Sequence, residues 1–266
     1  MRSSMTFVLA VLSMMLLSAQ EPSFEVASVK VSAKDEAPSG WTTFRPGQVT
    51  IHAAPLRLFL PVAFGVPIQL VKVTFDFNRV SRDLLERTYF DIQAKGSPTG
   101  DQTAMMQTLL RQRFGMKWHK EVRTLPLYNV TVNQPGKLGP WLKPSSVDCR
   151  DFFSKVLSKD QSAAVPAECL SLSTRGASMR QTRSAGTSSY LVTRLQQFAD
   201  LPLIDATGLK GTYSWDFVLP WTGPSNQEFL ATFRDALKDD LGLTLTRTTG
   251  PWEVIVIDDI RMPTPN

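Results

Sequence analysis

Hydrophobic and polar positions along the chain follow one pattern that occurs twice. Residues 102–114 carry apolar side chains at helical spacing, Gly115 follows, and two alternating apolar segments come next. Residues 225–241 and Gly242 repeat this order, again followed by two alternating segments. A helical period closed by glycine predicts an amphipathic helix with a left-handed cap, and the alternation predicts strands. The repetition indicates that one supersecondary unit was duplicated.

The two copies align over most of their length once Gly115 is set on Gly242. Two residues are skipped in the turn between the alternating segments. The aligned pairs are Leu110 with Leu237, Phe114 with Leu241, Pro126 with Pro251, Val130 with Ile255, and Asp91 with Asp216.

Each copy is predicted to contain a strand, a helix, a second strand, a second helix and a hairpin. Pro55 at a first helical position begins the first helix of the first copy, and Gly65 ends it. We expect residues 116–122 to pair with 127–132, and residues 243–248 to pair with 252–257. The predicted fold is α+β, with two tandem similar units. Each unit is a small mixed or antiparallel sheet with two helices packed on one face.

These units lead to a division of the 266 residues into five parts, since the length suits two small domains. The parts are a signal peptide at 1–20, a first repeat unit at 21–135, a connector rich in Pro, Ser and Lys at 136–172, a second repeat unit at 173–262, and a tail at 263–266.

The first twenty residues have the layout of a secretory signal. Arg2 precedes an apolar run from Met5 to Leu17, and the small residues Ser18 and Ala19 follow. The run is shorter than the roughly 20 residues that a membrane span needs. We expect an exported protein, periplasmic or extracellular. An uncleaved signal segment is the alternative and would be the chain's one contact with a membrane.

Export changes the interpretation of the two cysteines, Cys149 and Cys169, which both lie in the connector. An even number of cysteines in an oxidising compartment favours a disulfide. Two unrelated thiols are the alternative.

The net charge of +5 is modest, and the basic residues are scattered along the chain. A nucleic-acid surface would concentrate them in a stripe. We therefore expect no nucleic-acid partner.

Several phrases resemble one family of exported proteins of unknown function that is expanded in Acidobacteria. They are FEVASVK at 24–30, RFGMKWHKEVRTLPLYNVTV at 113–132, IDATGLKGTYSWDF at 204–217 and the ending from residue 240. The resemblance covers nearly the whole chain after residue 20. Related domains are attached to membrane-embedded metallopeptidase sensors of the antibiotic-sensing type. The resemblance therefore implies an extracytoplasmic sensing or docking role and no established activity.

Each half is also similar, in pattern alone, to the short N-terminal domain of secretins and TonB-dependent receptors. In those proteins a helix, a strand and a second helix precede a hairpin, and the domain serves as a docking module.

No familiar catalytic motif is found in the chain. The two histidines, His52 and His119, do not form an HExxH motif, and no Cys/His group has zinc spacing. An S-x-x-K nucleophile, a G-x-S-x-G elbow and a glycine-rich phosphate loop are also missing. We assign no catalytic, metal-binding or cofactor-binding residue and expect no cofactor.

Asp91 and Asp216 hold equivalent places in the two copies, between apolar neighbours. Paired acids can share acid–base work. Strand alternation alone explains them as residues of a polar sheet face, and that interpretation is preferred.

Three tryptophans lie in segments rich in Pro and Gly: Trp41, Trp141 and Trp221. Such residues can anchor a partner or a sugar, or they can fold back over the core. They are the candidate partner-binding residues.

The sequence thus predicts an exported, non-enzymatic binding, docking or sensor module. Its partner would be an envelope protein or a peptide that adds a strand to an open sheet edge. The alternative is an envelope hydrolase or another enzyme with an unrecognised active site. The sequence predicts no oligomeric state.

Overall fold

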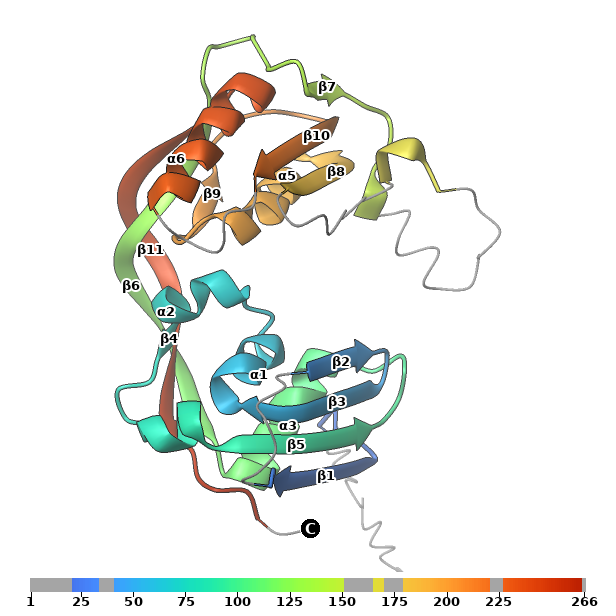
Figure 1. Cartoon of the computed structure of the whole chain (residues 1–266), viewed down its shortest axis with the longest axis vertical. Helices are drawn as coiled ribbons and strands as arrows, with labels where there is room; N and C mark the ends of the chain where they lie inside the picture. Colours follow the sequence, from blue (N-terminus) through green and yellow to red (C-terminus); the bar gives the residue numbers. More distant parts are fainter. Residues whose placement is uncertain (1–20, 34–40, 151–164, 170–178, 221–226, 265–266) are drawn as a thin grey trace, which may run out of the picture.

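A long two-stranded ribbon joins two lobes, one at each of its ends (Figure 1). The structure is a computed structural model that describes residues 21–33, 41–150, 165–169, 179–220 and 227–264. The predicted signal peptide and Trp221 lie outside the described residues.

The first lobe contains a four-stranded antiparallel sheet in the order β1-β5-β3-β2. Its inward side chains pack against helices α1 and α3 in one hydrophobic cluster. The elements of this lobe are β1 (Val26–Val31), β2 (Trp41–Arg45), β3 (Gln48–Pro55), α1 (Leu56–Ala63), η1 (Ile68–Leu70), α2 (Val71–Thr74), β4 (Phe75–Asp76), η2 (Asp83–Arg87), β5 (Tyr89–Lys95) and α3 (Gln102–Phe114).

The second lobe contains a three-stranded antiparallel sheet in the order β7-β10-β8. Helices α5 and α6 contribute to its core. The elements of this lobe are β7 (Leu142–Pro144), η3 (Ala167–Cys169), β8 (Met179–Thr187), α5 (Ser188–Leu195), η4 (Gln196–Phe198), β9 (Leu203–Asp205), β10 (Thr212–Pro220), α6 (Gln227–Ala236) and η5 (Leu237–Leu241).

The ribbon consists of β6 (Lys117–Val132) and β11 (Leu243–Asp259), which pair antiparallel along their whole length. The register runs from Leu243 opposite Val132 to Asp259 opposite Lys117. Two short strands extend the ribbon sideways: β4 pairs in parallel with β11, and β9 pairs in parallel with β6.

The α+β prediction is confirmed, but the two predicted hairpins are wrong. Residues 117–132 continue as one strand through Pro126, and residues 243–259 continue through Pro251. Each strand pairs with its counterpart from the other copy instead of folding back on itself. Because the copies are alike, this exchange offers each strand a similar apolar face, and alternation alone cannot reveal it.

The exchange places residues of each copy in the core of the other lobe. Ile255 and Ile257 of β11 belong to the cluster of the first lobe. Tyr128 and Val130 of β6 belong to the cluster of the second lobe. Full burial of a side chain such as Ile257 is worth about 1.5–3 kcal/mol. The domain boundaries near 135 and 173 stay predictions; the ribbon pairs a strand that precedes both of them with a strand that follows both.

The glycine caps form as the pattern predicts. Gly115 ends α3 with φ 57° and Gly242 ends η5 with φ 69°, both in the left-handed region. At the other end of α3, the Asp101 carboxylate accepts a hydrogen bond from the backbone N–H of Ala104 at 3.1 Å. Gly242 is also required sterically, because a Cβ there would lie 2.6 Å from the backbone nitrogen of Gly139.

The structure joins Cys149 and Cys169 in a disulfide, with 5.4 Å between their Cα atoms. The pair packs with Ala185 of β8, whose backbone N–H lies 3.2 Å from the Cys149 sulfur. The disulfide therefore fastens η3 to the sheet of the second lobe.

We predict that Ile257→Ala will loosen the first lobe, although Ile257 comes from the second copy. The loss of a fully buried side chain should cost about 2–5 kcal/mol. Amide hydrogen exchange should accelerate in α1, α3 and β5. The reciprocal control, Val130→Ala, should accelerate exchange in α5 and α6. Hairpins closed within each copy would produce the opposite assignment.

We also predict that reduction of the disulfide will lower the free energy of unfolding by about 3 kcal/mol. The sulfurs close a loop between residues 20 apart, and the chain-entropy model gives this magnitude for such a loop. Urea unfolding with and without reductant measures the difference, with the Cys149→Ser, Cys169→Ser double variant as control. Equal midpoints for oxidised and reduced protein would contradict the prediction.

Candidate functional site

A cavity of about 410 Å³ lies between the two lobes, against the ribbon. Its walls come from four parts of the chain: the segment after α1, helix α3, the ribbon, and the α5–β9 region of the second lobe. The apolar wall residues are Phe64, Val66, Pro67, Leu70, Val192, Leu203, Trp252 and Ile255. Elements η1 and η4 contact each other across the lobes. The cavity is therefore a feature of the assembled molecule.

The polar groups inside the cavity wall are engaged with the protein. The Trp252 indole N–H donates to the Thr74 hydroxyl at 3.1 Å. The Gln196 amide donates to the carbonyl of Leu201 at 3.0 Å and accepts from the N–H of Leu203 at 2.8 Å. Since these groups have partners, the wall presents itself to a ligand as mainly apolar.

One ion pair lies on the cavity lining. Lys120 of β6 and Glu253 of β11 are 2.7 Å apart, and their side chains are 57% and 55% exposed. An exposed pair of this kind contributes little to stability. It does place one positive and one negative group on the lining of the cavity.

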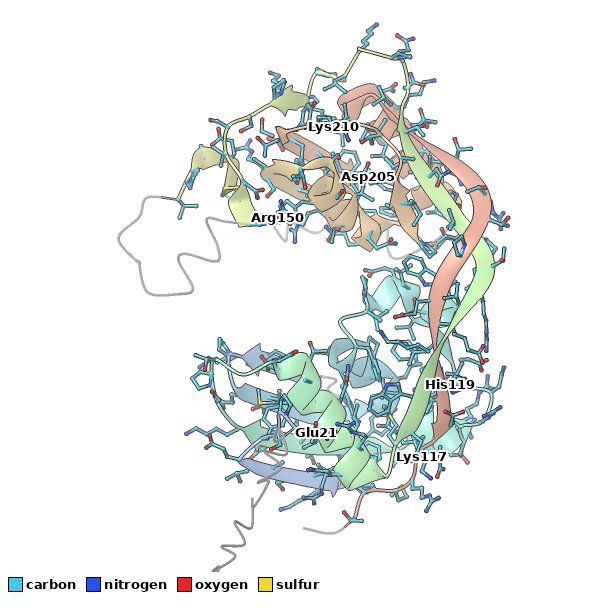
Figure 2. All side chains as sticks on the ribbon, turned by 180° about the vertical axis from the view of Figure 1, so that it is seen from behind. Glu21, Lys117, His119, Arg150, Asp205 and Lys210 are labelled. Atoms are coloured by element: carbon cyan, nitrogen blue, oxygen red, sulfur yellow. A yellow bond between two sulfur atoms is a disulfide. The ribbon has the colours of Figure 1, made fainter. Side chains whose placement is uncertain are left out.

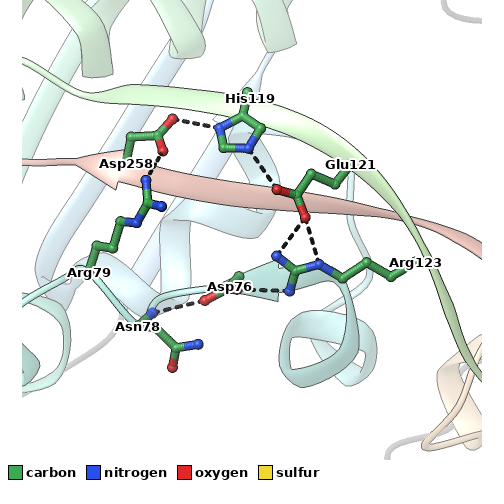
Figure 3. A network of polar contacts seen from close by, with 7 residues as sticks. All are labelled: Asp76, Asn78, Arg79, His119, Glu121, Arg123 and Asp258. Atoms are coloured by element: carbon green, nitrogen blue, oxygen red, sulfur yellow. Dashed lines mark hydrogen bonds and ion pairs between the residues drawn. The ribbon is translucent and has the colours of Figure 1, made fainter.

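A second polar feature lies at the end of the ribbon next to the first lobe (Figure 3). We call it the ribbon network, and its side chains are those of Asp76, His119, Glu121, Arg123 and Asp258. Figure 2 shows His119 and Lys117 there, far along the ribbon from Asp205 in the second lobe. His119 Nδ1 lies 2.7 Å from an Asp258 oxygen, and Nε2 lies 3.0 Å from a Glu121 oxygen. Only the protonated imidazolium donates to both carboxylates. The hydrogen bonds to Asp258 and then Glu121 raise the pKa of His119.

The ribbon network continues toward β4. Arg123 donates to Glu121 and, at 2.8 Å, to Asp76. The Asp76 carboxylate also accepts from the backbone N–H of Asn78 at 3.0 Å. That backbone bond, together with Arg123, lowers the pKa of Asp76. The pKa of Glu121 is lowered by His119 first and by Arg123 second.

The ribbon network covers two buried valines. Val254 lies opposite Glu121 and Val256 opposite His119 in the register, so each pair shares a sheet face. Both valines are less than 5% exposed. The network therefore fastens β4 to the ribbon and shields apolar residues, with its charged ends in solvent.

His52 and Asp91 form a pair on the sheet of the first lobe. Asp91 Oδ1 lies 2.8 Å from His52 Nδ1 and accepts from the backbone N–H of Ala53 at 2.9 Å. Ala53 has φ 44°, in a bulge where the register shifts between Ile51 and Ala54. A left-handed alanine is strained, and the hydrogen bond to Asp91 helps to hold it.

Asp216 takes part in a different contact. Arg183 of β8 donates to its carboxylate, with one nitrogen–oxygen distance of 2.8 Å. Asp91 and Asp216 belong to different sheets, so the structure does not bring the two equivalent acids together.

The Asp205 carboxylate accepts hydrogen bonds from three hydroxyl groups, a cluster that the sequence pattern did not predict. Its carboxylate accepts from Ser188 and Ser189 at 2.7 and 2.9 Å, and from the Thr207 hydroxyl at 2.7 Å. Burial alone would raise the pKa of Asp205, but the hydrogen bonds outweigh burial and lower it. The D-x-T spacing at 205–207 was the available signal, because an Asp two residues before a Thr forms an Asx turn.

The two candidate tryptophans that the structure describes lie in different lobes. Trp41 lies in β2, where it pairs with His52 in the first lobe. Trp141 precedes β7 in the second lobe and is 52% exposed. Their roles in partner binding stay predictions.

Among the described residues, no group of three or more His, Cys, Asp or Glu side chains is arranged to hold a metal ion. Over the same residues, no single helix has the length and apolar character to cross a membrane. Leu56–Ala63 and Ile68–Thr74, bent by 111°, meet that criterion only as a pair.

Comparison with known families decides where the chain belongs. The model of the family described as "Protein of unknown function (DUF3738)" matches residues 69–260. The chain belongs to the DUF3738 family. The DUF3738 match includes the ribbon and the second lobe but begins after α1. It agrees with the resemblance to a family of unknown function, and it names no reaction. The likeness to secretin and TonB-receptor domains stays a prediction. Curated proteins and solved structures give no match to the chain.

We predict that stability will fall as pH rises through the folded pKa of His119. A raised pKa means that the folded state holds this proton more tightly, so the contribution is full below the unfolded value near 6.5. Asp76 and Glu121, whose pKa values are lowered, act in the opposite range and lose their contributions on acidification.

Thermal unfolding of this DUF3738 protein between pH 5.5 and 8.5 measures the effect. His119→Asn should flatten the alkaline decline, and 1 M salt should weaken it by screening. Lys117→Asn on the same strand is the control and should keep the wild-type slope. An unchanged slope in His119→Asn would refute the assignment.

Proposed function

We propose that this protein is an exported binding module that holds an apolar segment of a peptide partner between its two lobes. The observation that carries the proposal is the cavity of about 410 Å³, whose walls come from both lobes and the ribbon. Ligand sites of this size with mainly apolar walls commonly lie at the interface between structural units.

The lining favours a peptide over a fully apolar ligand. Lys120 and Glu253 place opposite charges 2.7 Å apart beside an apolar wall. A peptide has apolar side chains that suit the wall, and its amide groups can both donate to a carboxylate and accept from an ammonium group. One or two side chains of the partner would enter the cavity, and its backbone would meet the ion pair.

The state of the polar wall groups favours binding over the alternative, an envelope hydrolase. A reaction centre needs polar groups directed at the substrate. Here Thr74, Gln196 and the Trp252 indole N–H are used in hydrogen bonds within the protein.

Two observations support export. The first twenty residues have the layout of a secretory signal. The Cys149–Cys169 disulfide is of a kind that persists in oxidising compartments and is rare in the cytosol. The resemblance to exported proteins agrees with both.

We predict that Thr193→Trp will block the cavity. Thr193 lines it from an exposed position on α5, so an indole there can cover the opening without entering the core. The probe is the dye 1-anilinonaphthalene-8-sulfonate, followed by the enhancement of its own fluorescence on direct excitation. Wild type should bind the dye at one site, and Thr193→Trp should weaken binding about tenfold, or about 1.4 kcal/mol.

Lys210→Trp is the matched control, because Lys210 is exposed on the second lobe away from the cavity lining. It should bind the dye as wild type does. Peptides selected from a random display library should have apolar centres and should lose affinity for Thr193→Trp only. Folded protein that binds neither dye nor peptide, or equal binding by both variants, would overturn the proposal.

A further inference from the structure

The sheet of the second lobe carries a polar pocket on the face that points away from its helices. In β10, Trp215 and Phe217 point into the core, so Ser214 and Asp216 lie on the opposite face. The pocket there has a volume of about 310 Å³. Its side chains come from β7, η3, β8, β10 and the residue before β7. The lining consists of Ala167, the core residue Trp215, and the six residues Trp141, Lys143, Glu168, Arg183, Ser214 and Asp216.

Among the residues that the structure describes, the charges of this pocket balance. Lys143 and Arg183 are positive, and Glu168 and Asp216 are negative. Arg183 also donates to the Asp216 carboxylate through its Nε atom at 2.8 Å. A lining whose described charges cancel favours neither an anion nor a cation. It offers donors and acceptors side by side, which suits a neutral ligand with many hydroxyl groups.

Trp141 provides the apolar part of the pocket. Its side chain is 52% exposed, although its backbone is held on both sides. The Trp141 N–H donates to the Asp240 carbonyl at 2.9 Å, and its carbonyl accepts from the N–H of Asp216 at 3.2 Å. An aromatic ring that is anchored by its backbone and open to solvent has one apolar face available to a partner.

A sugar ring combines the two chemistries that this pocket offers. The C–H groups of a pyranose form an apolar face that can stack on an indole, and the hydroxyls around its rim both donate and accept hydrogen bonds. Peptides and lipids do not present this alternation of apolar face and polar rim within one small ring.

The disulfide positions one wall of the pocket. Glu168 lies in η3 directly before Cys169, which is bonded to Cys149. The Cys149 sulfur accepts from the backbone N–H of Ala185 on β8, the strand that also carries Arg183. The disulfide and the hydrogen bond to Ala185 therefore connect the segment that carries Glu168 to the strand that carries Arg183.

The first lobe has a polar pocket at the equivalent place. It has a volume of about 450 Å³ and contains Asp91, the counterpart of Asp216, together with Ser28, Lys30, Thr50, His52 and Gln93. Polar pockets thus lie on the outer faces of both sheets. The exposed indole of Trp141 makes the pocket of the second lobe the better-defined site.

We propose that the pocket formed by Trp141, Lys143, Glu168, Arg183, Ser214 and Asp216 binds a neutral saccharide. This site is separate from the cavity between the lobes and shares no lining residue with it. The saccharide could come from the cell's own wall or from surrounding polysaccharides, and its ring chemistry is the same in both.

The test is co-sedimentation of the oxidised protein with three insoluble glycans: peptidoglycan sacculi, chitin and cellulose. Sacculi represent the cell wall, and the other two represent external polysaccharides. Calorimetric titration with chitotetraose and cellotetraose follows. Wild type should bind at least one glycan. Trp141→Ala should weaken that binding about tenfold, and Arg183→Lys, which keeps the charge but loses the planar fork, should weaken it severalfold.

Val122→Ala is the control, because Val122 is an apolar ribbon residue that is 73% exposed. It should bind as wild type does. Circular dichroism and thermal unfolding establish that each variant is folded. Binding to none of the glycans, or binding that Trp141→Ala leaves unchanged, would overturn the proposal. So would an equal loss in Val122→Ala. Loss of binding in Thr193→Trp with Trp141→Ala unaffected would assign the glycan to the other cavity.

Discussion

The pairing of β6 with β11 is the interaction on which the rest of the molecule depends. It runs without interruption from Leu243 opposite Val132 to Ile257 opposite Trp118. The ribbon delivers Ile257 to the core of one lobe and Val130 to the core of the other. Neither lobe has a complete core without it. The two lobes are therefore coupled by shared hydrophobic burial as well as by chain connection.

The sheet that contains the ribbon has a symmetric pairing pattern. The short strand β4 pairs in parallel with β11, and its counterpart β9 pairs in parallel with β6. Each copy thus builds its sheet extension on the strand of the other copy. Pro126 and Pro251 lie where the two hairpin turns would otherwise stand, and each is accommodated in an extended strand. The arrangement corresponds to an exchange of the two ribbon strands between the two lobes, within one chain.

The candidate sites follow from this architecture. Because the ribbon separates the lobes, apolar residues of both lobes and the ribbon surround one cavity, and Trp252 lies on its wall. The small sheets have their apolar faces buried against helices, which leaves their opposite faces polar. One face contains the His52–Asp91 pair and the other the Arg183–Asp216 pair. The two proposed binding sites, one apolar and one polar, thereby lie on different surfaces.

The sequence by itself determined the local features. Gly115 and Gly242 end helices because only glycine adopts their left-handed backbone without strain, and alternation correctly identified the strands within residues 117–132 and 243–259. The equivalence of Asp91 and Asp216 was also readable. Tertiary structure alone decided which strand each one joins, because two similar copies offer nearly equivalent partners and the choice depends on contacts more than a hundred residues apart. For the same reason, the cavity and the ribbon network of His119 could not be predicted, because each brings together side chains that only the exchanged fold makes neighbours. The serines around Asp205 depend on a shorter-range contact, the packing of α5 against β9 within the second lobe.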